Sequence, residues 1–327
     1  MNSAEGYFLG IDVGSVSTNL VLTDSNDNIV QKLYLRTGGQ PINVLLEGMR
    51  RIATGSGAGN IEAVGTTGSG RELAGVIVGS DIVKNEITTH AIAAQKVVEG
   101  VRTILEIGGQ DSKIILLRNG VVHDFAMNTV CAAGTGSFLD RQASRLGVPI
   151  EEFGSLALKS TSPVRIAGRC AVFAESDMIH KQQTGHSTED IVNGLCEALV
   201  RNYLNNLAKG KDIQEPIAFQ GGVAANVGIV KAFEKALGKR LIIPEYHAVM
   251  GAYGAALIAK EARMRNSGFK SRFYGFSSLN REYWAKSMEC QDCSNACEVI
   301  GIYSNGEALA FWGDKCGKWG RGQLSKI

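Results

Sequence analysis

Two cysteines stand in matching positions, each just ahead of a predicted helix. The segments are "NTVCAAGTGSFLD", with Cys131, and "GRCAVFAESDMIH", with Cys170. A cysteine at a helix N-terminus faces unpaired N–H groups and the positive end of the helix dipole, which favours an anionic set of metal ligands. A cubane iron-sulfur cluster usually takes four cysteines, so one chain would supply two and a two-fold dimer the rest. The alternative, favoured for cysteines in an arbitrary sequence, is a pair of buried, unligated thiols.

A second group of cysteines lies near the C-terminus, at Cys290, Cys293, Cys297 and Cys316. Short loops between close cysteines bring their sulfurs together, and a hairpin turning at Asn305-Gly306 returns the fourth one. The spacing therefore predicts a four-thiolate Zn²⁺ site that folds a small module, with a second [4Fe-4S] cluster as the alternative.

The strands that precede the first cysteine repeat those at the start of the chain. Strands are predicted at residues 7–12, 16–23 and 28–35. A shift of 94 residues places "IDVGSVSTNLVL" on "LEIGGQDSKIIL" and pairs Asp12 with Glu106. The second copy continues into "RNGVV", where Asn119-Gly120 is a strong hairpin signal. The repeat predicts a duplicated β-hairpin domain.

The two turns of this repeat have the residue types of a phosphate clamp. A carboxylate at a strand end, followed by glycine and hydroxyl residues, lets backbone N–H groups approach phosphate oxygens closely. Asp12, Glu106 and Asp111 could hold a hydrated Mg²⁺ or orient an attacking water, and Gln110 could orient that water. Turn chemistry alone is the alternative for a single copy. The residues predicted to contact the nucleotide are Gly14, Ser15, Ser17, Thr18, Gly108, Gly109, Gly221 and Gly222.

The rest of the chain reads as helices and one short strand. Apolar residues at helical spacing predict helices at 41–53, 88–99, 136–146, 171–183 and 189–209. A strand at 216–220, a turn at 221–226 and another helix follow, and a closing helix of small residues at 247–262 packs back on the first domain. We expect three parts: residues 1–104 with 249–266, residues 105–248 carrying Cys131 and Cys170, and a cysteine-rich module at 267–327.

Three segments resemble motifs of the actin, sugar kinase and heat-shock-protein-70 ATPase superfamily. They are "LGIDVGSVSTNLVL" and "EIGGQDSKI", which look like its two phosphate loops, and "AFQGGVAAN", which looks like its adenosine motif. The resemblance covers residues 6–265. It implies an α/β fold of two ribonuclease-H-like domains that bind ATP or ADP.

The cysteine segments, together with "NEITTHA" and "EIGGQDSK", resemble the activators of 2-hydroxyacyl-CoA dehydratases and the ATPase subunits of benzoyl-CoA reductases. The resemblance implies a homodimer that shares one [4Fe-4S] cluster, bound by Cys131 and Cys170 of each chain. It implies that ATP hydrolysis is coupled to delivery of a low-potential electron to a partner iron-sulfur dehydratase or reductase, with ferredoxin or flavodoxin as donor. Within "NEITTHA", Glu86 or His90 either contacts the phosphates or only caps a helix.

The cysteine-rich tail departs from the short activators, which end near the closing helix. The electron acceptor need not be the usual dehydratase and includes, as an alternative, a reductase with a double-cubane cluster. An ATP-dependent kinase of a small molecule and a chaperone-like ATP switch are the rival functions on the same fold.

Composition sets the broad class. The chain has 327 residues, 44% hydrophobic and 20% charged, with a net charge of +2, which gives no electrostatic case for nucleic acid. No apolar run reaches membrane-spanning length and no secretory signal is seen. Seven cysteines, an odd number, favour ligands or buried thiols over disulfides, so a cytoplasmic location is expected.

Overall fold

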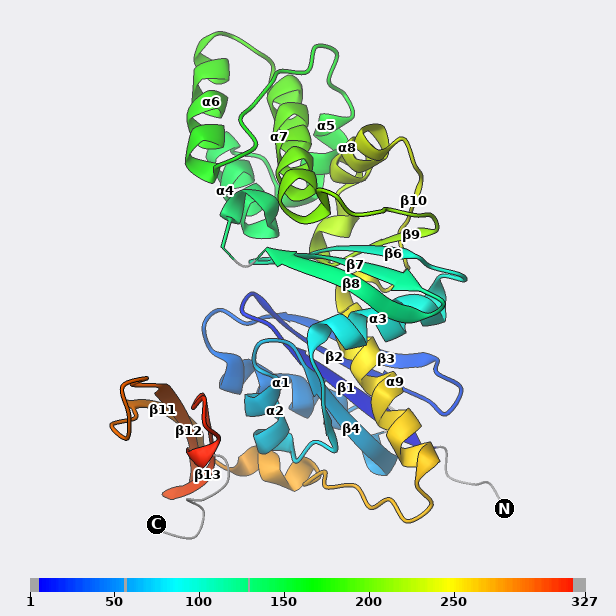
Figure 1. Ribbon diagram of the computed structural model, residues 1–327, viewed down its shortest axis with the longest axis vertical. Helices are drawn as coiled ribbons and strands as arrows, with labels where there is room; N and C mark the ends of the chain where they lie inside the picture. The colour runs from blue at the N-terminus through cyan, green and yellow to red at the C-terminus, as the bar shows by residue number, and fades with distance from the viewer. Residues whose placement is uncertain (1–5, 56–57, 129, 320–327) are drawn as a thin grey trace. The chain divides into compact units, whose positions relative to one another are not determined.

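The computed structural model describes residues 6–55, 58–128 and 130–319 (Figure 1). Contacts between residues divide the chain into two compact units. Unit 1 contains the residues up to Asn85 and those from Gly251 onward, and unit 2 contains Glu86–Met250. The three-part division expected from the sequence stays a prediction.

Unit 1 is built on a mixed five-stranded sheet of order β3-β2-β1-β4-β5. Strands β1, β2 and β3 form antiparallel pairs, while β4 and β5 join as parallel strands. The strands are β1 (Tyr7–Val13), β2 (Ser17–Thr23), β3 (Ile29–Arg36), β4 (Ile61–Thr67) and β5 (Ile82–Val83).

The two faces of this sheet are covered by different helices. Helices α1 (Pro41–Ala53) and α2 (Arg71–Val78) share a hydrophobic core with alternate residues of β1, such as Leu9 and Ile11. The other face meets α9 (Met250–Arg265) at very short range. A Cβ on Gly10 would lie 1.8 Å from the carbonyl oxygen of Ala252, so only glycine permits this approach. The closing helix thus packs on the first sheet, as predicted.

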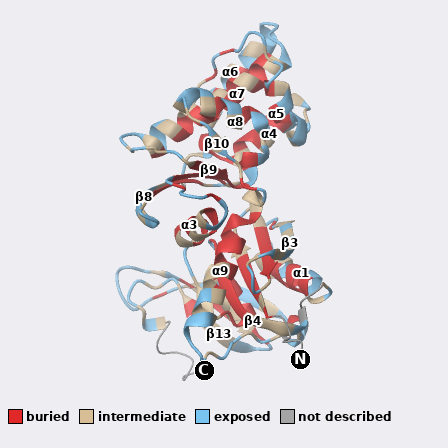
Figure 2. Cartoon of the chain, turned by 90° about the vertical axis from the view of Figure 1, so that its right-hand side faces the viewer, coloured by how far each residue is buried: buried red, intermediate tan, exposed pale blue. Residues whose placement is uncertain are grey.

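Unit 2 repeats this plan with a sheet of order β10-β9-β6-β7-β8. Figure 2 shows that the central strands of both sheets are largely buried. Because helices cover both faces, the central strands are nearly continuous apolar runs. The strands of unit 2 are β6 (Thr103–Ile107), β7 (Ser112–Arg118), β8 (Val121–Asn128), β9 (Ile217–Gln220) and β10 (Leu241–Ile242).

One face of the second sheet carries most of the unit's helices and the other carries α3 (Glu86–Val97), as Figure 1 shows. The larger group is α4 (Gly136–Leu146), α5 (Ile150–Ala157), α6 (Ala171–Gln183), α7 (Thr188–Tyr203) and α8 (Val227–Leu237). A π-helical turn, Leu204–Ala208, continues α7.

The register of strand pairing confirms the predicted duplication. Asp12 pairs with Asn19 in the first hairpin, and Glu106 pairs with Lys113 in the second, each shifted by 94 residues. Asn119 and Gly120 both have positive φ, as the predicted β7–β8 turn requires.

Residues 283–312 form a third, antiparallel sheet of order β11-β12-β13. Its strands are β11 (Tyr283–Glu289), β12 (Glu298–Ser304) and β13 (Glu307–Trp312). The predicted hairpin at Asn305 and Gly306 is present, since both have positive φ. Leu279 and Ile302 belong to the hydrophobic core of unit 1.

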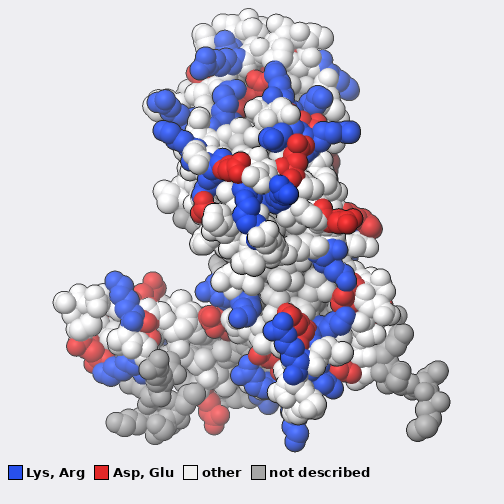
Figure 3. All heavy atoms as spheres, turned by 45° about the vertical axis from the view of Figure 1, so that its right-hand side comes forward, with Lys and Arg blue, Asp and Glu red and all other residues white. Residues whose placement is uncertain are grey.

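The α/β class and its mixed sheets agree with the sequence prediction, whereas the predicted metal-binding character of the C-terminal module is not confirmed. Lys and Arg side chains are interspersed with Asp and Glu on the face shown in Figure 3. Within the described ranges, no helix is both long and apolar enough to span a bilayer.

Candidate functional site

The first glycine turn, between β1 and β2, is closed by the backbone and braced by threonines. The amide of Gly14 donates to the carbonyl of Ser17 at 2.8 Å, and the hydroxyl of Thr37 donates to the carbonyl of Gly14 at 2.9 Å. The Thr18 hydroxyl is buried, 3.0 Å from that of Thr37. Ser15 is exposed, and Gly14 and Ser17 are half-buried. Of the four residues of this turn that are predicted to contact the nucleotide, only Ser15 is therefore fully exposed, and Thr18 is buried.

Asp12 lies at the end of β1, against the loop that follows β4. Gly68 of that loop has φ +87°, and a Cβ there would lie 2.4 Å from Oδ1 of Asp12. Asn19, across the hairpin, is buried and donates to the Ser17 hydroxyl at 3.3 Å. The carboxylate of Asp12 is therefore held close to the backbone at this end of the sheet.

The second turn, between β6 and β7, has the same hydrogen bond as the first. The amide of Gly108 donates to the carbonyl of Asp111 at 3.0 Å. Two further bonds join this turn to the start of α4: Gly136 N–H to Gly108 O, and Ser137 N–H to Gly109 O, both 2.9 Å. These hydrogen bonds join the second turn directly to the N-terminus of α4.

A buried lysine that the sequence analysis did not single out lies beside this turn. The ammonium of Lys113 is 2.9 Å from Glu106, 2.8 Å from Asp111 and 3.3 Å from Glu86. Lys113 and Glu106 are almost fully buried, while Asp111 and Glu86 are partly exposed. Three carboxyl groups thus surround one ammonium, but among the described residues these side chains do not gather as a metal site.

Burial changes the protonation of this cluster. Desolvation raises the pKa of Glu106 to about 8, although the charge of Lys113 opposes the shift. Burial alone would lower the pKa of Lys113, but the surrounding carboxylates, Glu106 first, raise it overall. Burial and the charge of Lys113 together lower the pKa of His90 to about 3. His90 is therefore neutral and Lys113 charged at pH 7.

The neutral His90 contacts Gln220 at the end of β9. Nδ1 of His90 is 2.7 Å from Nε2 of Gln220, so this amide donates and the imidazole accepts. Gln220 pairs with Glu106 across the parallel strands, which places it in the same polar row as Lys113. The imidazole of His90 is thus hydrogen-bonded to the end of β9, in the row that contains Glu106 and Lys113.

Gly221 and Gly222 follow Gln220. A Cβ on Gly221, whose φ is +90°, would lie 2.3 Å from the carbonyl of Ile107 and 2.7 Å from Oε1 of Glu106. Close approach to β6 therefore explains this glycine without a ligand. Gly222 is exposed, as is Gln110 of the second turn.

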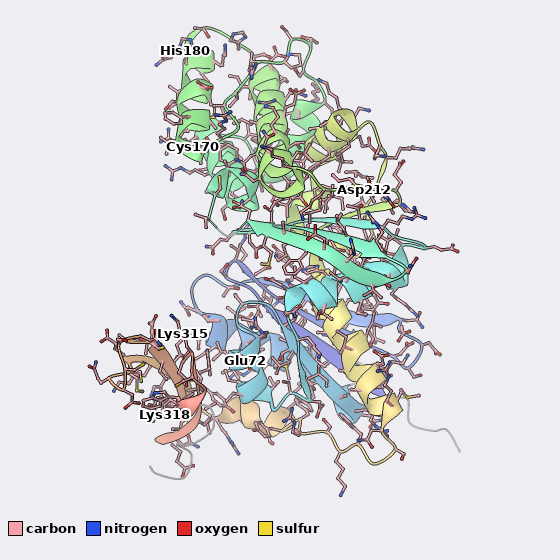
Figure 4. All side chains as sticks on the ribbon, viewed as in Figure 1. Glu72, Cys170, His180, Asp212, Lys315 and Lys318 are labelled. Atoms are coloured by element: carbon pink, nitrogen blue, oxygen red, sulfur yellow. The ribbon has the colours of Figure 1, made fainter. Side chains whose placement is uncertain are left out.

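The structure brings the segments of Cys131 and Cys170 together in unit 2. The sulfur of Cys131 is 3.8 Å from the carbonyl of Arg169, the residue before Cys170, and 3.5 Å from Nδ2 of Asn202. Both thiols are half-buried. Cys170 is the N-cap of α6, as predicted, and Figure 4 shows it at that end of the helix. Cys131 instead precedes a three-residue 3₁₀ turn, and α4 begins only at Gly136.

Several exposed apolar side chains lie next to these cysteines in the sequence. Val130 is 94% exposed, Val172 68% and Phe173 65%. By contrast, Cys196 is fully buried in the core of unit 2, and burial raises the pKa of its thiol to about 12. The molecule therefore holds one structural cysteine and two surface cysteines in the same unit.

Comparison with known proteins identifies the family to which this chain belongs. Residues 9–259 match the BadF/BadG/BcrA/BcrD ATPase family. The chain belongs to this ATPase family. The match includes both glycine turns, the Lys113 cluster and the two surface cysteines.

Similar proteins are named as activators of dehydratases. The 2-hydroxyisocaproyl-CoA dehydratase activator of Clostridioides difficile is 35% identical over 258 residues, covering 77% of this chain and 94% of the relative. The (R)-2-hydroxyglutaryl-CoA dehydratase activating ATPase of Acidaminococcus fermentans is 33% identical over 267 residues, covering 77% and 96%. A solved structure of the Clostridium difficile activator with bound ADPNP has a TM-score of 0.73 and 33% identity, covering 79% of this chain and 96% of that one.

The C-terminal cysteines lie beyond the residues that match the family. Cys290 is buried, its amide donates to the carbonyl of Cys297 at 2.8 Å, and Nε1 of Trp319 donates to its sulfur at 3.3 Å. Cys293 and Cys316 are exposed. Among the residues that the structure describes, no three or more His, Cys, Asp or Glu side chains gather as a metal site. The Zn²⁺ site stays a prediction.

The sequence patterns did not identify three residues that support the site, namely Lys113, Gln220 and Asn202. Lys113 follows Asp111 by two positions in "GGQDSK", and Gln220 precedes the two glycines, so both were within the quoted motifs. Asn202 on α7 gave no signal, because only folding brings it to Cys131 and to the carbonyl of Gly168.

Proposed function

We propose that this chain is a reductive activator: an ATPase that couples ATP hydrolysis to transfer of a low-potential electron to a partner iron-sulfur enzyme. Membership of an ATPase family and the similarity to dehydratase activators support this proposal. The observation that carries it is the pair of half-buried thiols, Cys131 and Cys170, on one surface of unit 2.

These two thiols suit a shared cluster better than a structural role. Thiolates are the ligands that iron-sulfur clusters take, and two per chain make half a set. The apolar side chains of Val172 and Phe173 beside them suit a protein-protein contact. In the proposal, Cys131 and Cys170 of two identical chains hold one [4Fe-4S] cluster, which when bound supplies one-electron transfer.

In the proposal the two glycine turns are the phosphate-binding segments. Their backbone N–H groups and the hydroxyls of Ser15 and Ser17 contact ATP or ADP. Asp12, Glu106 and Asp111 hold Mg²⁺ or orient the attacking water, and the exposed Gln110 positions that water. Lys113 keeps two of these carboxylates in place. Gly221 and Gly222 admit the adenosine.

Coupling between nucleotide and cysteines follows a short path within unit 2. Gly108 and Gly109 of the second turn accept hydrogen bonds from Gly136 and Ser137. Cys131 lies five residues before Gly136 on the same segment. A displacement of the turn on hydrolysis would therefore be transmitted directly to the chain that carries Cys131.

The proposal includes several partners. The electron acceptor is an iron-sulfur dehydratase or reductase component, ferredoxin or flavodoxin is the donor, and the protein works as a homodimer in the cytoplasm. The C-terminal cysteines bind Zn²⁺ or a second cluster. The hydrogen bond from the amide of Cys290 to the carbonyl of Cys297 supports metal binding here, because it brings the backbones of two of the four proposed ligands together.

Iron content of cysteine variants tests the proposal. Protein purified without oxygen should be brown. The variants Cys131→Ser and Cys170→Ser should each lose the iron that these two cysteines bind in the proposal. Cys196→Ala is the matched control, because Cys196 is buried in the same unit and should leave iron unchanged. Equal iron in all three variants, or a colourless wild type that phosphorylates a sugar, would refute the redox role.

A further inference from the structure

One buried asparagine connects the two segments that carry the surface cysteines. Asn202 lies in the last turn of α7 and is only 2% exposed. Its Nδ2 donates to the carbonyl of Gly168 at 2.6 Å and to the sulfur of Cys131 at 3.5 Å. Gly168 lies two residues before Cys170. A single amide group therefore contacts both cysteine segments.

The partners of this amide fix its orientation. An amide nitrogen carries two hydrogens, so one group can serve both acceptors, and a backbone carbonyl can only accept, so the atom that faces Gly168 is the nitrogen. On the other side, Nδ2 of Asn206 donates to Oδ1 of Asn202 at 3.1 Å. Asn206 belongs to the π-helical turn Leu204–Ala208, an irregularity that is frequent at functional sites.

Two glycines allow α7 to approach the cysteine segments closely. A Cβ on Gly134 would lie 2.7 Å from Oδ1 of Asn202. A Cβ on Gly168 would lie 2.8 Å from the carbonyl of Ala198, one turn earlier on α7. A side chain at either position would therefore displace the helix from the segments that Asn202 joins.

Other contacts hold the same segments without reaching a sulfur. The amide of Cys131 donates to Oδ1 of Asn128 at 2.9 Å, and Nδ2 of Asn128 donates to the carbonyl of Cys131 at 2.8 Å. Arg201 donates to the carbonyl of Ile166 at 2.6 Å. Across the described residues, Asn202 has the one side chain that donates a hydrogen bond to the sulfur of either surface cysteine.

We propose that Asn202 is the positioning residue of the Cys131–Cys170 centre: its amide ties the two cysteine segments together, and its hydrogen bond to the Cys131 sulfur raises the reduction potential of the bound cluster. This inference rests on the proposed function and adds a residue that tunes it. Uptake of one electron adds negative charge to the ligating sulfurs, and a nearby N–H group stabilises that charge. The bridge is buried within one chain, so it leaves the cysteines free to meet a second copy.

Redox titration of the anaerobically purified dimer tests the proposal. The full-length parent protein carries Cys293→Ser/Cys316→Ser, so that iron at the C-terminal cysteines does not contribute. Asn202→Ala removes the donor. Its midpoint potential should lie about 30–60 mV below that of the parent, which is roughly a three- to tenfold change in the one-electron equilibrium.

Asn193→Ala is the matched control. Asn193 also lies on α7, and its Nδ2 donates to the carbonyl of Ala157 on α5 at 3.1 Å. This variant loses a comparable hydrogen bond between a side chain and the backbone, but none to a cysteine segment. Its potential should equal that of the parent.

Asn206→Ala provides a second measurement that keeps Asn202 in place. Asn206 is exposed, so the variant should fold, and loss of its bond to Oδ1 makes the Asn202 amide a weaker donor. The potential should shift in the same direction as in Asn202→Ala, but by less. This expectation holds even where Asn202→Ala releases its iron.

Hydrogen exchange of the iron-free variants, followed by mass spectrometry, checks the bridge itself. Asn202→Ala should exchange faster than Asn193→Ala at residues 131–134 and 166–170, because both segments lose a common partner. Equal exchange in the two variants would overturn the proposal. A parent-like potential in Asn202→Ala, or in Asn206→Ala where the first variant holds no iron, would also overturn it.

Failure of the proposed function has a different signature. A parent protein without iron at Cys131 and Cys170 would refute the redox role and, with it, the effect of Asn202 on a potential. Faster exchange in Asn202→Ala would still assign the bridge between the two segments to this residue.

Discussion

The two hairpins of the duplicated domain share a backbone but differ in charge. The same bond closes both turns, from Gly14 to Ser17 and from Gly108 to Asp111. Asp12 lies opposite a neutral Asn19 in unit 1, whereas Glu106 in unit 2 lies opposite Lys113. The duplication therefore preserved the hydrogen bond that closes each turn, while the second copy has its own buried counter-ion.

Removal of the counter-ion Lys113 should have the largest effect on the free energy of unfolding. Lys113→Met leaves Glu106 and Asp111 without their ammonium, and we expect a loss of about 3–5 kcal/mol in the free energy of unfolding. Asn19→Ala, at the equivalent position, removes one weak hydrogen bond and should cost about 1 kcal/mol.

Denaturant unfolding of both variants checks this difference. Similar costs at the two positions would show that the lysine is not a counter-ion.

The second expected effect is a pH dependence peculiar to unit 2. The pKa of Glu106 rises from 4.5 to about 8, so folding favours its protonated form, and that stability is lost as pH rises toward 8. The lowered pKa of His90 acts in the opposite sense, with stability lost as pH falls from 6.5 toward about 3. Above pH 6.5, of these two groups, only Glu106 titrates.

We therefore expect the wild type to lose about 2 kcal/mol between pH 6.5 and 8 relative to Glu106→Gln, at about 1.4 kcal/mol per pH unit. Urea titrations of both proteins in the presence of a metal chelator measure this. Parallel stability curves for the two would mean that Glu106 is ionised throughout.

The smallest effect concerns the hydroxyls at equivalent positions of the two turns. Thr18 is 3.0 Å from the Thr37 hydroxyl, so Thr18→Val should cost about 1 kcal/mol. Ser112 has a buried hydroxyl with no partner among the described residues, so Ser112→Ala should be neutral or slightly stabilising. Thermal unfolding compares the two, and a larger loss for Ser112→Ala would show that its hydroxyl has an unseen role.

Local signals in the sequence predicted much of this architecture. The hairpin repeat follows from the shift of 94 residues, and the bounds of α1, α4 and α6 agree with the helical patterns. Strand β4 and helix α2 were not identified, because a glycine- and threonine-rich strand buried on both faces shows no alternation.

The site was less accessible to sequence reasoning, because its electrostatics depend on topology. A lysine within a strand gives no sign that Glu86, Glu106 and Asp111 will surround it. The 3₁₀ turn Ala132–Gly134 after Cys131 is another example: α4 begins only at Gly136, so this cysteine does not cap a long helix. Motifs identified the chain segments, and folding determined which side chains meet.

The central claim is that two chains share one cluster through Cys131 and Cys170. Native mass spectrometry of anaerobically purified Cys293→Ser/Cys316→Ser protein tests it directly, because these substitutions disable the C-terminal cysteine group. We predict a dimer that carries about two iron atoms per chain and that loses them all on Cys170→Ser. A monomer with a complete cluster, or a dimer that retains its iron without Cys170, would contradict the account.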